Sequence, residues 1–224
     1  MKLINDIINE LMDTNNAITS ALLKTKVLAS RLDNTLLQAW VNGELNGYVE
    51  NSELPSYRES SGILEGSFLN GLAKGSNMAF PVAQIPKREL DEITSIEVRD
   101  SITSIELMIN KKGLKISVNS NRRLYLQNSI RNMGNPQFQI ISVYLEIPAF
   151  LFTNILSSVR SKLLDFMLEL EKKFGYEAEI DELKAKKDMV TQIFHTAIST
   201  NGNGNIITSG NHNDNDVYTE IDKA

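Results

Sequence analysis

The stretch Phe138-Gln-Ile-Ile-Ser-Val-Tyr-Leu-Glu-Ile-Pro148 joins two kinds of structure. Its first ten residues are rich in β-branched and aromatic side chains, which favour a strand over 138–147. Pro148 suits the first turn of a helix, because the N–H that proline lacks has no helical partner there. A broad apolar face follows, and Gly175 supplies a helix stop. The sequence therefore predicts an α+β fold in which a strand leads into a long helix over 150–174.

Residues 1–48 show the spacing of a three-helix unit. Apolar residues recur there at intervals of three and four in three successive runs, as expected for the buried faces of helices. Asp33 or Asn34 is positioned to cap the third helix, and Gly47 suits its end. We therefore expect the chain to begin with a compact helical unit.

Residues 49–147 combine short strands with short helices. Prolines and glycines punctuate the first part of this region and predict extended segments joined by turns. Helices are expected over 87–93 and 98–109, where the apolar spacing is helical. Alternating apolar residues over 114–118 and 124–126 indicate strands. Together with the strand that ends before Pro148, they predict a small antiparallel β region.

The C-terminal part reads as a second helical unit and a tail. A further long helix is predicted over 179–195, so residues 148–198 would form a helical hairpin. We therefore expect one domain over 1–198, followed by an Asn/Gly-rich tail over 199–224.

Composition excludes several classes of site. The 224 residues carry a net charge of −5, with no cysteine and two histidines, which excludes disulfides and thiolate chemistry and leaves little for a histidine-rich metal site. The first ten residues contain Asp6 and Glu10 and do not resemble a secretory signal. No apolar run approaches the roughly 20 residues of a membrane span. A cytoplasmic protein without a membrane span is expected.

Two linked motifs carry a family resemblance. The run Trp40-Val-Asn-Gly-Glu-Leu-Asn-Gly-Tyr48 is followed by Leu54-Pro-Ser-Tyr-Arg58. Together they resemble the signature of the AbiTii family of abortive-infection, or phage-defence, proteins, in which a helical unit leads through a Leu-Pro-x-Tyr-Arg turn into a glycine-containing β segment. The signature positions are Trp40, Glu44, Leu45, Gly47, Tyr48, Pro55, Tyr57 and Arg58. The resemblance covers most of residues 1–200 and implies a role in defence against bacteriophage. It implies no reaction and no catalytic residues.

Arg58 has two possible partners. An arginine beside a turn makes bidentate contacts with a carboxylate or a phosphate. An internal pair, for instance with Glu44, would make the motif structural, whereas an external anion would make it a binding site. The sequence leaves both alternatives open, as it does for Arg160 and Asp165, which can pair with neighbouring elements.

No catalytic constellation is recognisable. His195 and His212 show none of the spacings of a metal site or a general-base pair. The acidic residues near the motif are spread as on a surface, at Glu44, Glu53, Glu59 and Glu65. We therefore expect no metal and no cofactor, and whether the protein is an enzyme stays open, with a non-enzymatic role favoured.

One segment is strongly basic within this acidic protein. Between Leu107 and Leu145 no acidic residue occurs, and Tyr125 lies among the basic residues. Such a segment can follow a phosphate backbone, or it can pair with acidic groups of the same protein or of a neighbouring subunit. The candidate nucleic-acid or anion ligands are Lys111, Lys112, Lys115, Arg122, Arg123 and Arg131.

The tail has its own character. It holds six of the 23 asparagines, interleaved with glycines and with short β-prone pairs. A polar tail of this kind is either disordered or ordered by pairing with copies of itself. The candidate oligomerisation residues are Ile206, Ile207, Val217 and Tyr218.

Three functional hypotheses follow. The leading one is a non-enzymatic phage-defence protein that acts by self-assembly, as a homo-oligomer, or by binding a phage or host protein. The second is a nuclease-like or nucleic-acid-binding toxin that uses the basic segment 111–131. The third is a regulatory module for a separately encoded effector.

Overall fold

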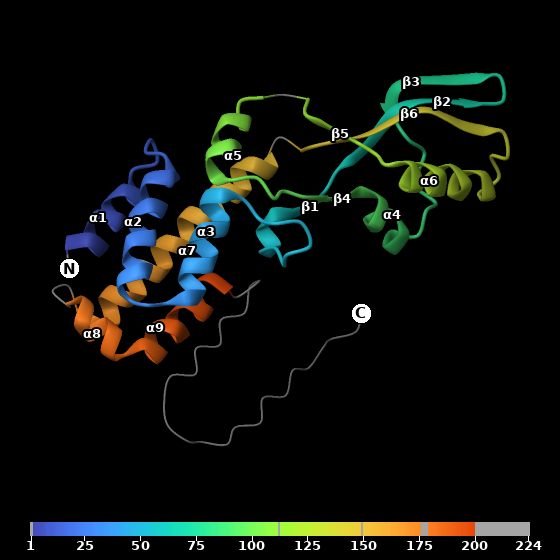
Figure 1. The fold of residues 1–224 in the computed structure, drawn as a ribbon. Coiled ribbons are helices and arrows are strands. Elements are labelled where there is room, and N and C mark those ends of the chain that lie inside the picture. Colours follow the sequence, from blue (N-terminus) through green and yellow to red (C-terminus); the bar gives the residue numbers. More distant parts are fainter. Residues whose placement is uncertain (1, 112, 149, 176–178, 200–224) are drawn as a thin grey trace, which may run out of the picture.

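The computed structural model describes residues 2–111, 113–148, 150–175 and 179–199. The molecule is elongated, with a bundle of helices at one end and a β-sheet with its covering helix at the other (Figure 1). The helical end contains α1 (Lys2–Met12), α2 (Ile18–Arg31), α3 (Thr35–Asn46), α5 (Ile102–Met108), α7 (Phe150–Phe174), α8 (Ile180–Ala185) and α9 (Lys187–Phe194), which continues as a π-helical turn, His195–Ser199. The expected α+β class is confirmed.

The first three helices form as their apolar spacing predicts. In α1 the buried side chains are Ile4, Ile7, Ile8 and Leu11, a single face of the helix. Asn34 caps α3, because its side chain accepts a hydrogen bond from the backbone N–H of Leu37 at 2.9 Å. Gly47 ends α3 with φ of +88°, a conformation that favours glycine. The predicted helical unit is therefore confirmed.

The long helix α7 is the centre of the helical end. Its buried side chains recur at helical spacing along its whole length, and α1, α5 and α9 pack against it. Arg160 lies on its surface and donates hydrogen bonds to the backbone oxygens of Leu11, Asp13 and Asn16 at 2.7–3.0 Å. These contacts satisfy carbonyls where α1 ends, which confirms the expectation that Arg160 pairs with a neighbouring element.

The sheet occupies the other end of the molecule. Its four antiparallel strands lie in the order β3-β2-β6-β5, with the bounds Ala73–Ala79, Ile63–Asn70, Phe138–Glu146 and Lys115–Ser117. Phe68, Phe80 and Phe138 form an aromatic cluster with ring centroids 4.9–6.2 Å apart. Helix α6 (Ser120–Asn132) packs on β6, and α4 (Lys87–Thr94) lies nearby (Figure 1). The predicted strand 138–147 is confirmed as β6.

A smaller sheet lies between the two ends. Strands β1 (Glu59–Ser61) and β4 (Ser95–Glu97) pair antiparallel, and a 3₁₀ turn, η1 (Ser56–Arg58), precedes β1. No helix within the described ranges is long and apolar enough to cross a membrane. The tail and its four candidate residues Ile206, Ile207, Val217 and Tyr218 lie outside the described residues.

Some predicted elements differ from the structure. Residues 124–126, predicted to be a strand, lie inside α6. Leu126 is buried one turn before Ile130, whereas Leu124 is 57% exposed, so the apolar face follows helical spacing. The Asn119 side chain caps α6 by accepting a hydrogen bond from the Arg122 backbone N–H at 2.9 Å, which starts the helix close to the predicted strand.

The other differences concern helix boundaries. The helix predicted over 179–195 is divided into α8 and α9, because Lys186 adopts φ of −109° and ψ of 42°. The helix expected over 98–109 begins only at Ile102, where the Ser101 side chain accepts a hydrogen bond from the Ser104 N–H. Val98 instead precedes this helix as a buried residue. The hairpin of two long helices thus becomes one long helix, α7, packed against the short α9, which in turn contacts the short α8.

Candidate anion-binding site

The motif residues meet inside the protein around Glu44. This carboxylate, on α3, forms a salt bridge with Arg58, whose Nη2 lies 2.6 Å from Glu44 Oε2, and both side chains have 0% exposure. Arg58 Nε donates a second bond to Glu44 Oε1 at 3.2 Å. The arginine also donates from Nη1 to the backbone oxygens of Val98 and Asp100. Of the two alternatives for Arg58, the internal pair is therefore the one found.

Three aromatic residues complete this buried network. The hydroxyls of Tyr48 and Tyr57 donate to Glu44 Oε1 at 2.7 and 2.8 Å. Trp40 Nε1 donates to the Tyr57 oxygen at 2.9 Å. The Arg58 guanidinium also lies over the Tyr48 ring, 4.8 Å from its centroid. The network joins α3 to η1 and to the segment before α5.

The remaining motif residues shape the backbone around the network. Gly47 packs tightly, since a Cβ there would lie 2.7 Å from the backbone oxygen of Arg99. Pro55 precedes η1, and Leu45 packs half-buried against the core. Every motif position therefore has a packing or hydrogen-bonding role in the fold.

The network shifts the acid–base behaviour of its members. Burial, followed by the charge of Glu44, raises the pKa of Tyr48 and Tyr57 far above their usual range, so both stay protonated. Burial acts to lower the pKa of Arg58, but the hydrogen bond and charge of Glu44 outweigh it and the pKa is raised. Arg58 is thus held in its charged form.

The basic segment does not form one continuous surface. On β5, Lys115 Nζ lies 3.6 Å from Glu65 Oε2 and over the ring of Tyr144. Arg122 donates to the backbone oxygen and the hydroxyl of Ser95. Lys111 is exposed in the loop before β5, and Lys112 lies outside the described residues. Of the described candidate residues of this segment, only Arg123 and Arg131 line the same pocket.

Arg123 and Arg131 converge on one edge of β6. Strand β5 pairs only with residues 144–146 of β6, so within the described residues the first half of β6 has no strand beside it on this side. Side chains of α6 occupy the gap: Arg123 donates to the Ile140 oxygen and Arg131 to the Phe138 oxygen, each at 2.7 Å. The side chain of Gln127 accepts the Ile140 N–H at 2.9 Å. These polar groups stand in for a missing strand.

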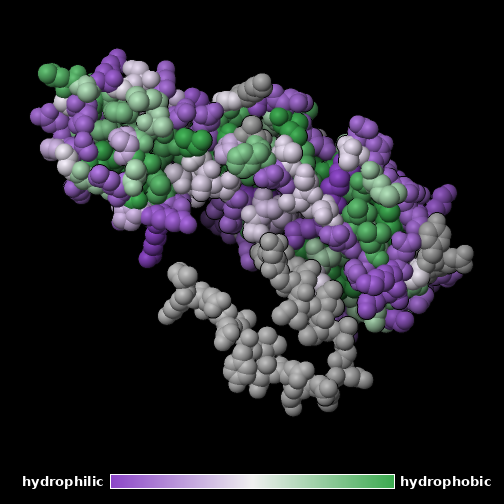
Figure 2. Space-filling view, turned by 180° about the vertical axis from the view of Figure 1, so that it is seen from behind, coloured by the Kyte–Doolittle hydropathy of each residue, from purple (hydrophilic) through white to green (hydrophobic). Residues whose placement is uncertain are grey.

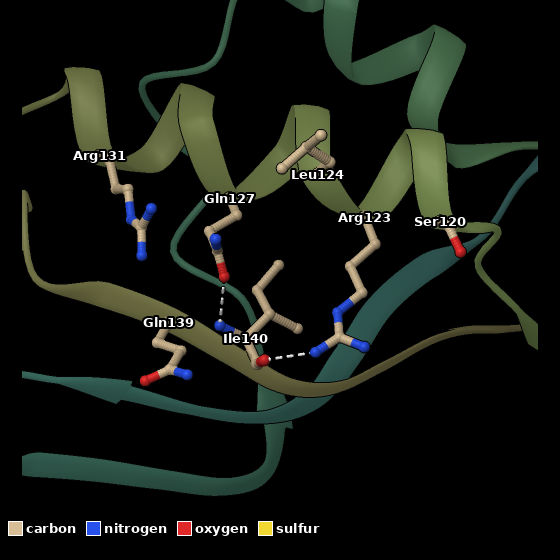
Figure 3. Close-up of a pocket in the computed structure, with 7 residues that line it drawn as sticks. All are labelled: Ser120, Arg123, Leu124, Gln127, Arg131, Gln139 and Ile140. Carbon is tan, nitrogen blue, oxygen red and sulfur yellow. Dashed lines mark hydrogen bonds between the residues drawn. The ribbon is translucent and has the colours of Figure 1, made fainter.

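A pocket of about 360 Å³ lies between α6 and this edge. Figure 3 shows both guanidinium groups pointing from the helix toward β6, with Gln127 between them. None of the seven lining residues is acidic: they are Ser120, Arg123, Leu124, Gln127, Arg131, Gln139 and Ile140. Two positive charges without a carboxylate among them favour an anionic ligand.

Sequence reasoning found the two arginines but missed the other lining residues. The signal was present, because Arg123, Gln127 and Arg131 are spaced by four residues and so share one helix face. Because a strand was predicted over 124–126, the spacing of four residues was not recognised as a helix face.

The other candidate groups do not converge on a metal or catalytic site. His195 is exposed at the end of α9, and His212 lies outside the described residues. Glu53 and Glu59 line a separate open hollow together with Glu97 and Arg99. Within the described part of the chain, no group of three or more His, Cys, Asp or Glu side chains is placed to hold a metal ion.

Comparison with known proteins places the chain in a family. The AbiTii family matches residues 2–196, nearly the whole of the described chain. The chain belongs to the AbiTii family. Membership implies a role in abortive infection, the defence in which an infected cell stops growing or dies before phage is released. No curated protein and no solved structure matched the chain.

Among the positions that suggested this AbiTii membership, the buried network explains why Trp40, Glu44, Tyr57 and Arg58 occur together. These residues stabilise the fold through hydrogen bonds to one another. The pocket between α6 and β6 lies in the sheet end of this AbiTii chain and involves none of them.

Proposed function

We propose that this AbiTii protein acts in abortive infection by binding a partner at the pocket between α6 and β6. One observation carries the proposal. Arg123 and Arg131 each use one nitrogen on β6, and within the described residues their remaining guanidinium nitrogens have no hydrogen-bond partner. Charged donors left over in a pocket without carboxylates are suited to recognise an anionic group from another molecule.

The surroundings of the pocket support a binding role. Arg123 and Leu124 are exposed, so a partner reaches the site without opening the fold. Figure 2 shows hydrophobic side chains at the surface of the sheet end, on the left of that view. Leu72 at the β2–β3 turn and Met78 on β3 are exposed large apolar residues of this end. Exposed apolar groups at the end of the molecule that carries a charged pocket suit an interaction surface.

Self-association is the second candidate function, and one observation favours it. Strand β3 is an edge of the main sheet, and within the described structure it pairs with a strand on one side only. An unpaired edge is a template for a strand from another chain. The oligomerisation role of the tail, one of the two alternatives that its sequence leaves open, remains a prediction. So does the cytoplasmic location.

Expression with and without phage tests the proposed function. Cells that carry the wild-type chain should yield fewer plaques, and R123Q/R131Q should lose this protection while the protein still accumulates. The double variant R31Q/R88Q removes the same charge from exposed sites elsewhere and should protect like the wild type. Equal protection by R123Q/R131Q would contradict the proposal.

The same experiment addresses the regulatory alternative. If the chain is a module for a separately encoded effector, expression of this chain alone should neither protect cells nor slow their growth. Protection by the chain alone would remove that alternative.

A further inference from the structure

We infer that the pocket between α6 and β6 binds single-stranded nucleic acid, with phosphates on Arg123 and Arg131 and a base between them. The inference deepens the proposed function and rests on it for its biological role. It names the class of partner that the pocket recognises.

The spacing of the two arginines sets the first requirement. They lie eight residues apart on α6, so their attachment points are about 12 Å apart along the helix axis. The two guanidinium groups bind different backbone oxygens of β6, and Gln127 lies between them (Figure 3), so each is placed to bind a phosphate of its own. A polymer that repeats its negative charge along its length meets the requirement, and a nucleic-acid strand is such a polymer.

The floor of the pocket sets the second requirement. Gln127 uses its amide oxygen on the Ile140 N–H, which leaves its NH₂ group as a donor. Gln139 is exposed and adds a second amide (Figure 3). Amides recognise base edges, and the side chain of Leu124, 57% exposed, offers an apolar surface to a base face. A ligand with phosphates at both ends and a base between them matches this order of groups.

The geometry favours a single strand over a duplex. The basic face of α6 is turned toward β6, so it is not free to lie in the major groove, where a recognition helix binds. A pocket of about 360 Å³ between a helix and a sheet edge admits an unpaired base, which a duplex does not present. Single-stranded sites commonly combine such a pocket with a cationic groove.

Binding of a labelled oligonucleotide tests the inference. The probes are fluorescein-labelled oligodeoxythymidine and oligouridine of about 12 nucleotides, and fluorescence anisotropy reports binding to the full-length protein. R123Q/R131Q should weaken binding at least tenfold. It should also lower the slope of log K against log salt by about 1.4, the value for two phosphate contacts on a single strand.

A second variant separates binding from folding, because both arginines also hold β6. The Gln139 side chain makes no hydrogen bond within the described residues, so Gln139→Glu adds a negative charge to the pocket without removing a contact. Q139E should weaken binding at least tenfold while its thermal melt matches that of the wild type. The charge-matched control R31Q/R88Q should bind with wild-type affinity.

Three results would overturn the inference. These are no binding by the wild type at about 50 mM salt, unchanged binding by Q139E, or equal binding of heparin, a polyanion without bases. ATP as a competitor distinguishes the source of the phosphate. If ATP displaces the labelled probe only at a much higher concentration than an unlabelled oligonucleotide does, the polymer is supported as the ligand. If ATP displaces the probe at the same concentration, the ligand is a free nucleotide and the assignment to a polymer is overturned.

Failure of the inference is distinguishable from failure of the proposed function. A wild-type protein that protects cells but binds no oligonucleotide overturns the inference and leaves partner binding in place. A protein that binds oligonucleotide through the pocket but gives no protection overturns the proposed function and leaves the site.

Discussion

At the scale of single residues, Glu44 and Arg58 form a fully buried ion pair that links α3 to η1, where the two ends of the molecule meet. Two charges with no exposed surface are costly to bury, and the surrounding hydroxyls and backbone oxygens offset that cost only while both partners are present. We therefore expect the pair to give more to the specificity of the contact between α3, η1 and the α5 segment than to net stability.

Replacing Arg58 by methionine should be strongly destabilising. The substitution leaves the Glu44 carboxylate buried without its counter-charge, and we expect the free energy of unfolding to fall by about 3–5 kcal/mol. Urea denaturation followed by circular dichroism measures the loss. The control is Arg88→Met, whose ion pair with Glu92 is exposed, with side-chain exposures of 92% and 70%. It should cost no more than about 0.5 kcal/mol. Similar losses for both variants would contradict the assigned role of Arg58.

The raised pKa values of Tyr48 and Tyr57 predict alkaline instability. An unfolded tyrosine ionises near its ordinary pKa of 10.0, whereas the folded protein keeps both protons above that pH. Stability from these groups is therefore complete below pH 10.0 and is lost as the pH rises from there toward the raised pKa values. In a spectrophotometric titration, two of the six tyrosines should form phenolate only as the protein unfolds. Reversible ionisation of all six near pH 10.0, with the fold intact, would refute this.

At the scale of elements, α6 decides what the sheet end can do. Its buried side, with Leu126 and Ile130, covers the sheet, and its polar side supplies the groups that complete the free half of β6. A strand in its place would also have put Arg123 and Arg131 on one face, but about 26 Å apart, whereas the helix brings their attachment points to about 12 Å.

The N-cap of α6 gives a test at this scale. Asn119→Ala removes the side-chain acceptor of the Arg122 N–H and should destabilise the protein by about 1 kcal/mol in urea denaturation. Asn128 is exposed within the same helix, where alanine is the better helix former, so Asn128→Ala should be neutral or slightly stabilising. A loss on Asn128→Ala equal to that on Asn119→Ala would argue against the helix boundaries.

At the scale of the whole molecule, two ends with different surfaces share one chain. The helical end packs around α7, and the sheet end carries the free edge of β3 and the arginine pocket. Figure 1 shows the two ends. This division suits a protein whose helical end is a stable body and whose sheet end meets partners.

The predicted self-assembly is tested on the full chain. Light scattering should give a mass above the 25.1 kDa of one chain. If the tail is the oligomerisation element, I206S/I207S should reduce that mass, because both substitutions remove β-prone side chains. L23S/V27S removes two exposed apolar side chains from α2 and should leave the mass unchanged. A wild-type protein that is monomeric at micromolar concentration would end the assembly hypothesis.

How much could be predicted follows the range of the interactions involved. The three N-terminal helices, β6 and α7 were predicted from periodicity and capping, which depend on neighbours in the chain. The strand expected over 124–126 failed because only Leu126 of the two leucines is buried, one turn before Ile130, in a helix that the Asn119 cap begins. In the candidate site, charge identified the arginines, but the distance between them depended on the helix.

The sequence by itself determined the α+β class, the helical start, the family and the charge of the basic segment, since all of these are written in local pattern and composition. Only the tertiary structure decided which side chains meet. It placed Arg58 on Glu44 rather than on an external anion, sent Arg122 and Lys115 to separate partners, and brought Arg123 and Arg131 to the unpaired half of β6. The physical reason is that a charged side chain takes the partner that packing brings within hydrogen-bond distance, and packing joins segments that lie far apart along the chain.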